Sequence, residues 1–263
     1  MSIRKGKLLK DFFTFARGEI FSWDVDPQFP LLKRHYADLD LDIDTALWWS
    51  LLYLSFYHFG SAEESWKLYP KQVIIKRKLR LPVTKNRRVF RGNDRAQEQL
   101  NYILTHKGPI RKWVESTIGK GGKEGWALMK EEFQSIGFNG AWSSYKWCDI
   151  LKQVHGYNIT APNIGDKVGA TAGPIPGLAT LTGRSWQECA HDYNLHQELF
   201  DLCLAKSIPM NGLDQLESVL CNFQGLVNGR YYAGHDIDRD ATQLLPESSL
   251  WKVRQKVFHS SYL

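Results

Sequence analysis

Hydrophobic residues recur along most of the chain with the three- and four-residue spacing of amphipathic helices. Helices are predicted at 12–21, 46–59, 96–104, 110–118, 126–136, 186–206 and 213–222, with a last one near Leu250. Residues 73–89 instead alternate loosely between β-branched and basic residues, and Pro82 interrupts them. This pattern predicts a hairpin or an extended arm. The pattern predicts a mainly α fold with one small extended or β segment.

The longest apolar run, residues 46–59, contains three polar residues and is shorter than the roughly 20 residues that cross a bilayer. A buried helix is therefore predicted, and no membrane span. Asp40, Asp42 and Asp44 precede it, and acids suit the positive N-terminal end of a helix. Alternating acids also suit a metal loop, but the central Gly and terminal Glu of an EF-hand are missing, so capping is the favoured interpretation.

Residues 125–156 predict a helical hairpin, two amphipathic helices joined by the short turn 136–140 (Ile-Gly-Phe-Asn-Gly). Glycines in such a turn expose backbone amides, and the two helix ends can then hold a phosphate of a DNA strand. The alternative is an ordinary corner in which Gly caps the first helix. Further along, Gly173-Pro174 and Pro176-Gly177 predict a rigid loop that is neither helix nor strand and that can shape a pocket wall.

Positive charge is concentrated in one segment of the chain. The net charge of +6 is by itself a weak hint of an anionic partner. Between positions 67 and 91, however, ten residues are basic and none is acidic, while the remainder is slightly negative. Because a phosphate-binding face needs such a local excess, we expect a basic arm at about 67–91 that binds DNA. Its expected contacts include Lys76, Arg77, Lys78, Arg80 and Arg88.

Composition indicates a globular protein. With 43% hydrophobic residues, the chain can bury a full core as one large domain or two tightly joined lobes, and a single domain over 1–263 is predicted. The four cysteines have no paired spacing and no apolar leader follows Met1, so a reducing cytoplasm is expected.

Several catalytic motifs are missing from the sequence. It has no phosphate loop GxxxxGK, no GxGxxG after a strand, no HExxH, no GxSxG and no zinc-deaminase signature. Common nucleotide-cofactor enzymes are thereby excluded, and no cofactor and no metal are predicted.

Charged residues in unusual surroundings are the remaining candidates for chemistry. Arg88, Arg91, Asp94 and Arg95 cluster where the arm meets a helix, either as a phosphate clamp or as an Asp N-cap beside solvated arginines.

Two carboxylates lie on apolar helical stretches: Asp149, near Lys146, and Glu217, three residues after Asp214. Each is either half of a structural ion pair or functional. His235, Asp236 and Asp238 are too few, in a single loop, to assert a metal site.

At these residues the sequence resembles the helical, glycosylase-like proteins of bacteriophage thymine hypermodification. These include the α-glutamyl/putrescinyl thymine pyrophosphorylase family of amino-acid or amine:DNA transferases, and the helical domain of hydroxymethyluracil DNA kinases. The matching pieces span about half the chain: VFRGNDRAQ (89–97), IGFNGAWSSYKWCDI (136–150), GPIPGL (173–178) and LESVLCNF (216–223). Two details depart from the family: the loop is not Gly-Pro-Gly, and Asn222 stands where Glu is more usual.

The resemblance implies a DNA-glycosylase-like helical fold and a reaction at thymine in DNA. The 5-methyl group would carry pyrophosphate, and an amino acid or amine would replace it, after the base has left the duplex. Expected partners are thus DNA and an amine. Aromatic stacking would come from Trp142, Tyr231 and Tyr232, among others. Positive charge at the leaving group would come from Arg91, Arg95, Lys146 or Arg184. Asp149 or Glu217 would take the proton of the attacking amine.

Two other functions stay open at this point. A helix-hairpin-helix DNA glycosylase carries a catalytic Asp, or Lys plus Asp, shortly after its hairpin, and Asp149 could play that part. A non-catalytic DNA-binding phage protein would use its acids only structurally. The amine donor, the DNA sequence context and the order of pyrophosphate loss and amine addition are not indicated by any residue.

Overall fold

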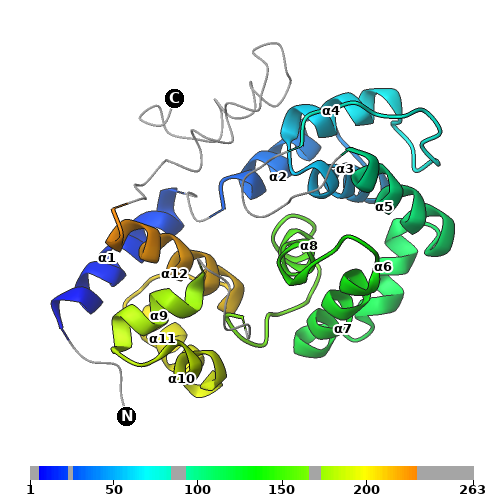
Figure 1. Cartoon of the computed structure of the whole chain (residues 1–263). Helices are drawn as coiled ribbons and strands as arrows, with labels where there is room; N and C mark the ends of the chain where they lie inside the picture. The colour runs from blue at the N-terminus through cyan, green and yellow to red at the C-terminus, as the bar shows by residue number, and fades with distance from the viewer. Residues whose placement is uncertain (1–5, 23–25, 84–92, 166–172, 230–263) are drawn as a thin grey trace. The chain divides into compact units, whose positions relative to one another are not determined.

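A computed structural model describes residues 6–22, 26–83, 93–165 and 173–229, and within these ranges the chain forms twelve helices and no β-strand. The mainly α prediction is confirmed. The chain divides into two compact units (Figure 1). Among the described residues, one unit comprises 6–22, 26–27, 160–165 and 173–229, and the other comprises 28–83 and 93–159. A single domain over the whole chain stays a prediction.

The unit built on residues 28–159 has α3 at its centre. Its helices are α2 (Gln28–Asp38), α3 (Ile43–Phe56), α4 (Phe59–Leu68), α5 (Asn93–His106), α6 (Ile110–Ile118), α7 (Gly122–Ser135) and α8 (Ala141–Gln153). Helix α3 is apolar on nearly every face and packs against α4, α5, α6 and α8, as expected of a helix without a polar side (Figure 1). Asp42 caps it, since Oδ1 accepts the Thr45 N–H at 2.8 Å, so the predicted capping role is confirmed.

The basic arm begins inside α4, which contains Lys67, and residues 69–83 then form neither helix nor strand. Its alternation has a packing reason: Ile75 and Leu79 are buried, while Lys76, Arg77, Lys78 and Arg80 are exposed. Amide side chains of α5 hold the backbone. Gln97 accepts the Leu79 N–H at 2.9 Å and donates to the Ile75 carbonyl at 2.8 Å, and Asn101 accepts the Ile75 N–H at 2.8 Å. The described part of the arm contains no β-strand, and the choice between a hairpin and an extended arm stays a prediction because residues 84–91 lie outside the described part of the chain.

The other unit contains α1 (Lys7–Ser22), α9 (Pro174–Thr182), α10 (Trp186–His191), α11 (Tyr193–Ala205) and α12 (Leu213–Val227). Helix α12 packs against α9, α1 and α11. The Phe12 ring of α1 meets the edge of Phe223 at 5.2 Å between centroids. Gly177 of α9 lies so close to α12 that an added Cβ would fall 2.4 Å from the Leu220 carbonyl oxygen.

The loop predicted around Gly173–Leu178 is wrong, because α9 begins there. Gly173 is the N-cap and Pro174 the first helical residue. Prolines in the first turn of a helix cost no hydrogen bond, since the first amides have no partner inside the helix. The segment is thus a helix start whose Gly177 permits close packing against α12.

Some boundaries also differ from the prediction. The helix expected over 186–206 is divided at Asp192, whose side chain caps α11 by accepting the Leu195 N–H at 3.0 Å. Helices α2 and α4 were not predicted. The helix expected near Leu250 lies outside the described residues.

No helix in the described part of the chain is long and apolar enough to cross a membrane. The same residues contain no group of three or more His, Cys, Asp or Glu side chains placed to hold a metal ion.

Candidate active site on helix α8

Three of the predicted site residues share one face of α8. Trp142, Lys146 and Asp149 follow one another at spacings of four and three residues, which places them in a row along the helix. Trp142 is partly exposed, whereas Lys146 and Asp149 are buried. The predicted helical hairpin formed by α7 and α8 presents this row toward α2 and α3, as the contacts of Trp142 and Lys146 show.

Lys146 and Asp149 form a buried ion pair. Lys146 Nζ lies 2.7 Å from Asp149 Oδ2, and the two side chains are 5% and 2% exposed. The two residues were predicted to hold pyrophosphate and to accept a proton, respectively, and the structure places these two groups against each other. A single buried charge without a partner is very unfavourable. Each of these two charged side chains can therefore be buried only because the other is present.

Aromatic rings surround this pair. The Phe29 ring of α2 lies over Lys146, with Nζ 5.2 Å from its centroid, a cation–π distance. Trp142 meets Tyr57, the C-cap residue of α3, edge to face at 5.0 Å between centroids. Gln28 donates to the Tyr57 hydroxyl at 3.3 Å. The row on α8 and its neighbours thus bring together a cation, a carboxylate, an amide and three aromatic rings. These groups are suited to binding a nucleobase.

Cys148, next to Asp149, takes no part as a nucleophile. Burial raises the pKa of its thiol well above the usual value, and the charge of Asp149 adds to this effect. The thiol faces the Trp126 carbonyl at 3.7 Å. It therefore stays neutral and structural at pH 7.

The turn of the hairpin does not end α7 with a glycine cap, so that predicted form is wrong. Helix α7 ends at Ser135 and its C-cap residue Ile136 is extended, so Gly137 is not its cap. Two of the turn amides bind inside the protein: the Gly140 N–H donates to Ser143 Oγ at 3.1 Å, and the Asn139 N–H donates to the Ile136 carbonyl at 3.3 Å. Those two amides are therefore engaged internally rather than offered to a phosphate.

Three other predicted cations, Lys78, Arg95 and Arg184, contact protein groups. Lys78 pairs with Asp94 at 2.9 Å on the surface, and both side chains are more than half exposed. Asp94 lies in the first turn of α5 and is not its N-cap. The Arg95 guanidinium lies 5.4 Å from the centroid of the Phe138 ring.

Arg184 lies in the other unit and pairs with Asp192 at 2.6 Å. Because Asp192 also caps α11, this pair joins the end of α9 to the start of α11.

Glu217 lies on α12, in a different unit from Asp149. Ser218 Oγ is 3.2 Å from Glu217 Oε2 and 3.1 Å from Oδ2 of the buried Asp26. One turn further, Asn222 donates to the buried Glu19 at 2.7 Å. A Glu at position 222 would set two carboxylates against each other, so the departure from the usual family residue has a local reason.

Some predicted residues lie outside the described part of the chain: Arg88, Arg91, Tyr231, Tyr232, His235, Asp236 and Asp238.

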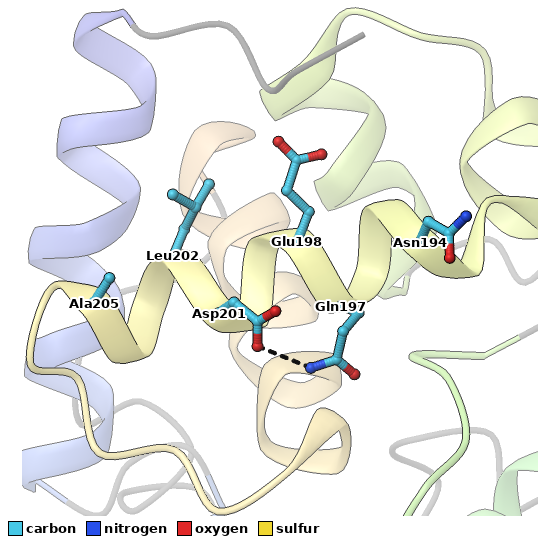
Figure 2. A pocket seen from close by; sticks show the side chains of 6 residues that line it. All are labelled: Asn194, Gln197, Glu198, Asp201, Leu202 and Ala205. Atoms are coloured by element: carbon cyan, nitrogen blue, oxygen red, sulfur yellow. Dashed lines mark hydrogen bonds between the residues drawn. The ribbon is translucent and has the colours of Figure 1, made fainter.

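A shallow depression follows the outer face of α11, lined only by that helix: Asn194, Gln197, Glu198, Asp201, Leu202 and Ala205 (Figure 2). Gln197 donates to Asp201 at 2.9 Å across it (Figure 2). Its two charged residues are acidic, which disfavours a DNA phosphate. We therefore place the candidate site on α8.

Sequence reasoning missed Gln28, Phe29 and Tyr57. Nothing in the sequence places α2 and the end of α3 beside α8, since the pairing of helices distant in the chain depends on tertiary packing.

A family model described as amino acid:DNA transferase matches residues 84–232, more than half of the chain. The chain belongs to this family. Membership supports a transferase kind of function that uses DNA and an amino acid as substrates. No curated protein matches the chain.

The family match includes the whole α7–α8 hairpin with Trp142, Lys146 and Asp149, and also Glu217 on α12. It begins after the described part of the basic arm, so Lys76, Arg77, Lys78 and Arg80 precede the matched residues. The resemblance inferred from the four sequence pieces is thereby confirmed.

Proposed function

We propose that the protein transfers an amino acid or amine to thymine in DNA, with pyrophosphate on the 5-methyl group as the leaving group. Membership in the amino acid:DNA transferase family is the observation that carries this proposal. The cation, carboxylate and aromatic rings at one face of α8 also support it, because the reaction needs groups of these kinds.

The reaction balances without a redox cofactor. The bond between the 5-methylene carbon and the pyrophosphate oxygen breaks, and pyrophosphate leaves with both electrons. The lone pair of a neutral amine forms the new carbon–nitrogen bond, and the amine then loses one proton. The protein must therefore supply positive charge for the leaving group and an acceptor for the proton.

Lys146 and Asp149 match these two requirements. In the proposed complex the Lys146 ammonium shifts from Asp149 to a pyrophosphate oxygen, and the released carboxylate accepts the proton of the amine. Trp142, at the partly exposed end of the row, stacks on the flipped base together with the buried Tyr57 that it contacts. Glu217 is the second candidate for the proton acceptor, in the unit built on α12.

The ion pair must be uncovered before substrate reaches it, because both side chains are almost completely buried. Phe29 is the ring that lies over Lys146. We expect Phe29 to move from Lys146 when the base enters, since a charged phosphate is a stronger partner for an ammonium than an aromatic ring.

Mass spectrometry of nucleosides tests this function. DNA carrying 5-pyrophosphorylated methyl-deoxyuridine is incubated with the purified protein and a panel of amino acids and amines, then digested to nucleosides. The proposal predicts a nucleoside whose mass equals that of thymidine plus the amine minus two hydrogen atoms, with its glycosidic bond intact. An unchanged substrate nucleoside with every donor would refute it.

A DNA glycosylase is the second candidate, favoured by one specific observation. Lys146 and Asp149 follow the turn of the hairpin in the order Lys then Asp, the two residue types expected there in a base-excising enzyme of this kind, and they are in contact. Release of a free base in the same assay supports excision, whereas retention of the base with a new mass supports transfer.

A further inference from the structure

Phe138 stands at the tip of the α7–α8 hairpin in an unfavourable backbone conformation. Its φ is +71°, in the left-handed region that a bulky residue rarely adopts. The glycines beside it in the turn, Gly137 and Gly140, do not have a positive φ. The turn therefore places a phenylalanine where glycine would be relaxed.

Burial does not compensate for this strain, because the Phe138 side chain is 47% exposed. The turn beneath it is firmly held. Asn139 accepts from Gln99 at 2.7 Å and donates to the Phe133 carbonyl at 3.0 Å, and Ser143 binds the Gly140 amide. Strained residues that a rigid surrounding holds in place concentrate at functional sites.

An arginine side chain lies over the exposed ring of Phe138. Arg95 lies over its ring, and this arginine extends from the first turns of α5. Gln97 and Asn101 of the same helix hold the backbone of the basic arm, and Lys78 of the arm reaches Asp94. Helix α5 thus links the exposed ring to the exposed cations of the arm within one unit.

We propose that Phe138 inserts into the DNA base stack beside the target thymine and fills the space that the flipped base leaves. Arg95 orients the ring and contacts the neighbouring phosphate. The proposal rests on the proposed function, since a base must leave the duplex to reach the α8 residues. Apolar wedges of this kind partly unstack base steps and stabilise the distorted duplex.

The observations favour DNA over a protein as the occupant. A single exposed ring with an arginine over it differs from the broad apolar patch of a protein interface. Both Phe138 and Arg95 lie inside the residues that match the family.

Fluorescence of 2-aminopurine, placed in a duplex next to the target position, measures the unstacking directly. Wild-type protein should raise the fluorescence, and Phe138→Ala should lose most of that rise and about tenfold in affinity for the intact duplex. Phe138→Trp should retain both, because it keeps an aromatic ring. The matched control is Leu128→Ala, which removes an equally exposed apolar side chain (44%) from α7 and should behave as wild type.

Two further measurements separate insertion from a folding defect. Phe138→Gly removes the ring and relieves the left-handed strain, so it should melt no more than slightly below wild type and still fail to unstack DNA. On a duplex with an abasic position at the target, the difference in affinity between Phe138→Ala and wild type should be smaller, since no base needs to leave.

Equal fluorescence and equal affinity of Phe138→Ala and wild type on the intact duplex would overturn the insertion. If the protein unstacks DNA through Phe138 but transfers no amine, the proposed reaction is wrong and the insertion is still supported. Loss of activity in Phe138→Ala with an undiminished fluorescence rise, or binding of a protein by this ring in place of DNA, also overturns the insertion.

Discussion

Lys146 and Asp149 lie one turn apart on α8, with Nζ 2.7 Å from Oδ2 and both side chains almost fully buried. This contact joins the residue expected to hold the leaving group to the residue expected to take the proton. It also ties their chemistry to the stability of the fold, because neither charge is buried alone. Mutations at this pair must therefore be judged on stability and on turnover together.

Asp149→Asn should lower the free energy of unfolding by about 3–5 kcal/mol, because it leaves the Lys146 ammonium buried without its opposite charge. The double variant Lys146→Met with Asp149→Leu should recover much of that loss, since it buries no charge. Thermal midpoints and single-turnover rates are measured on the same preparations. If the double variant is stable and inactive, the pair is needed for chemistry, whereas full activity removes it from the mechanism.

Three of the four cations at positions 76–80 should contribute to DNA affinity. Lys78 is paired with Asp94, whereas Lys76, Arg77 and Arg80 are exposed. Replacing these three with Ala should reduce the slope of log affinity against log salt by up to about 2.7, at roughly 0.9 per phosphate contact. The control replaces Lys112, Lys120 and Lys123, three exposed lysines of the α6–α7 region. An equal change of slope in both triple variants would show that the arm has no special role.

Gly177→Ala should destabilise the unit built on α12 by about 1–3 kcal/mol, because its Cβ would meet the Leu220 carbonyl oxygen at 2.4 Å. Gly173→Ala is the matched control in the same sequence motif. Its φ of −179° suits any residue and an added Cβ meets nothing within 4 Å. Thermal denaturation of the two variants checks this, and similar midpoints would contradict the close packing of α9 on α12.

Acid should destabilise the protein through His35. Burial lowers the pKa of this histidine to about 4, against the weaker opposing charge of Asp38. Neither ring nitrogen has a hydrogen-bond partner among the described residues. The unfolded chain, with an ordinary His pKa near 6.5, therefore binds the proton more tightly than the folded chain.

Stability contributed by the neutral ring is accordingly complete above about pH 6.5 and falls as the pH decreases toward 4, by about 3 kcal/mol at pH 4. His35→Met should flatten this part of the curve of unfolding free energy against pH. Urea denaturation of both proteins between pH 7 and pH 4 provides the comparison. Parallel curves would show that the pKa of His35 is the same in the folded and the unfolded chain.

The sequence could predict the elements whose signals are local. The apolar run that became α3, its cap at Asp42 and the α7–α8 hairpin follow from hydrophobic spacing and capping chemistry. Residues Ile75 and Leu79 of the arm alternate with its cations for a reason that only the structure supplies, namely their packing on α5.

Other features depended on contacts between distant residues. Prolines near Gly177 suggested a loop, although a helix start tolerates them and the glycine is required by α12. Gln28, Phe29 and Tyr57 reach α8 from α2 and α3, a pairing that no local pattern encodes. The family resemblance identified the α8 carboxylate as a candidate, but only the structure shows that Lys146 binds it.

Transfer of an isotopic label tests the central claim most directly. DNA with the pyrophosphorylated thymine is incubated with the protein and a ¹⁵N-labelled amino acid or amine, and the nucleosides and the released pyrophosphate are quantified together. Our account predicts one ¹⁵N in each product nucleoside and one pyrophosphate released per nucleoside formed. Pyrophosphate or free base released without ¹⁵N in the DNA would contradict it.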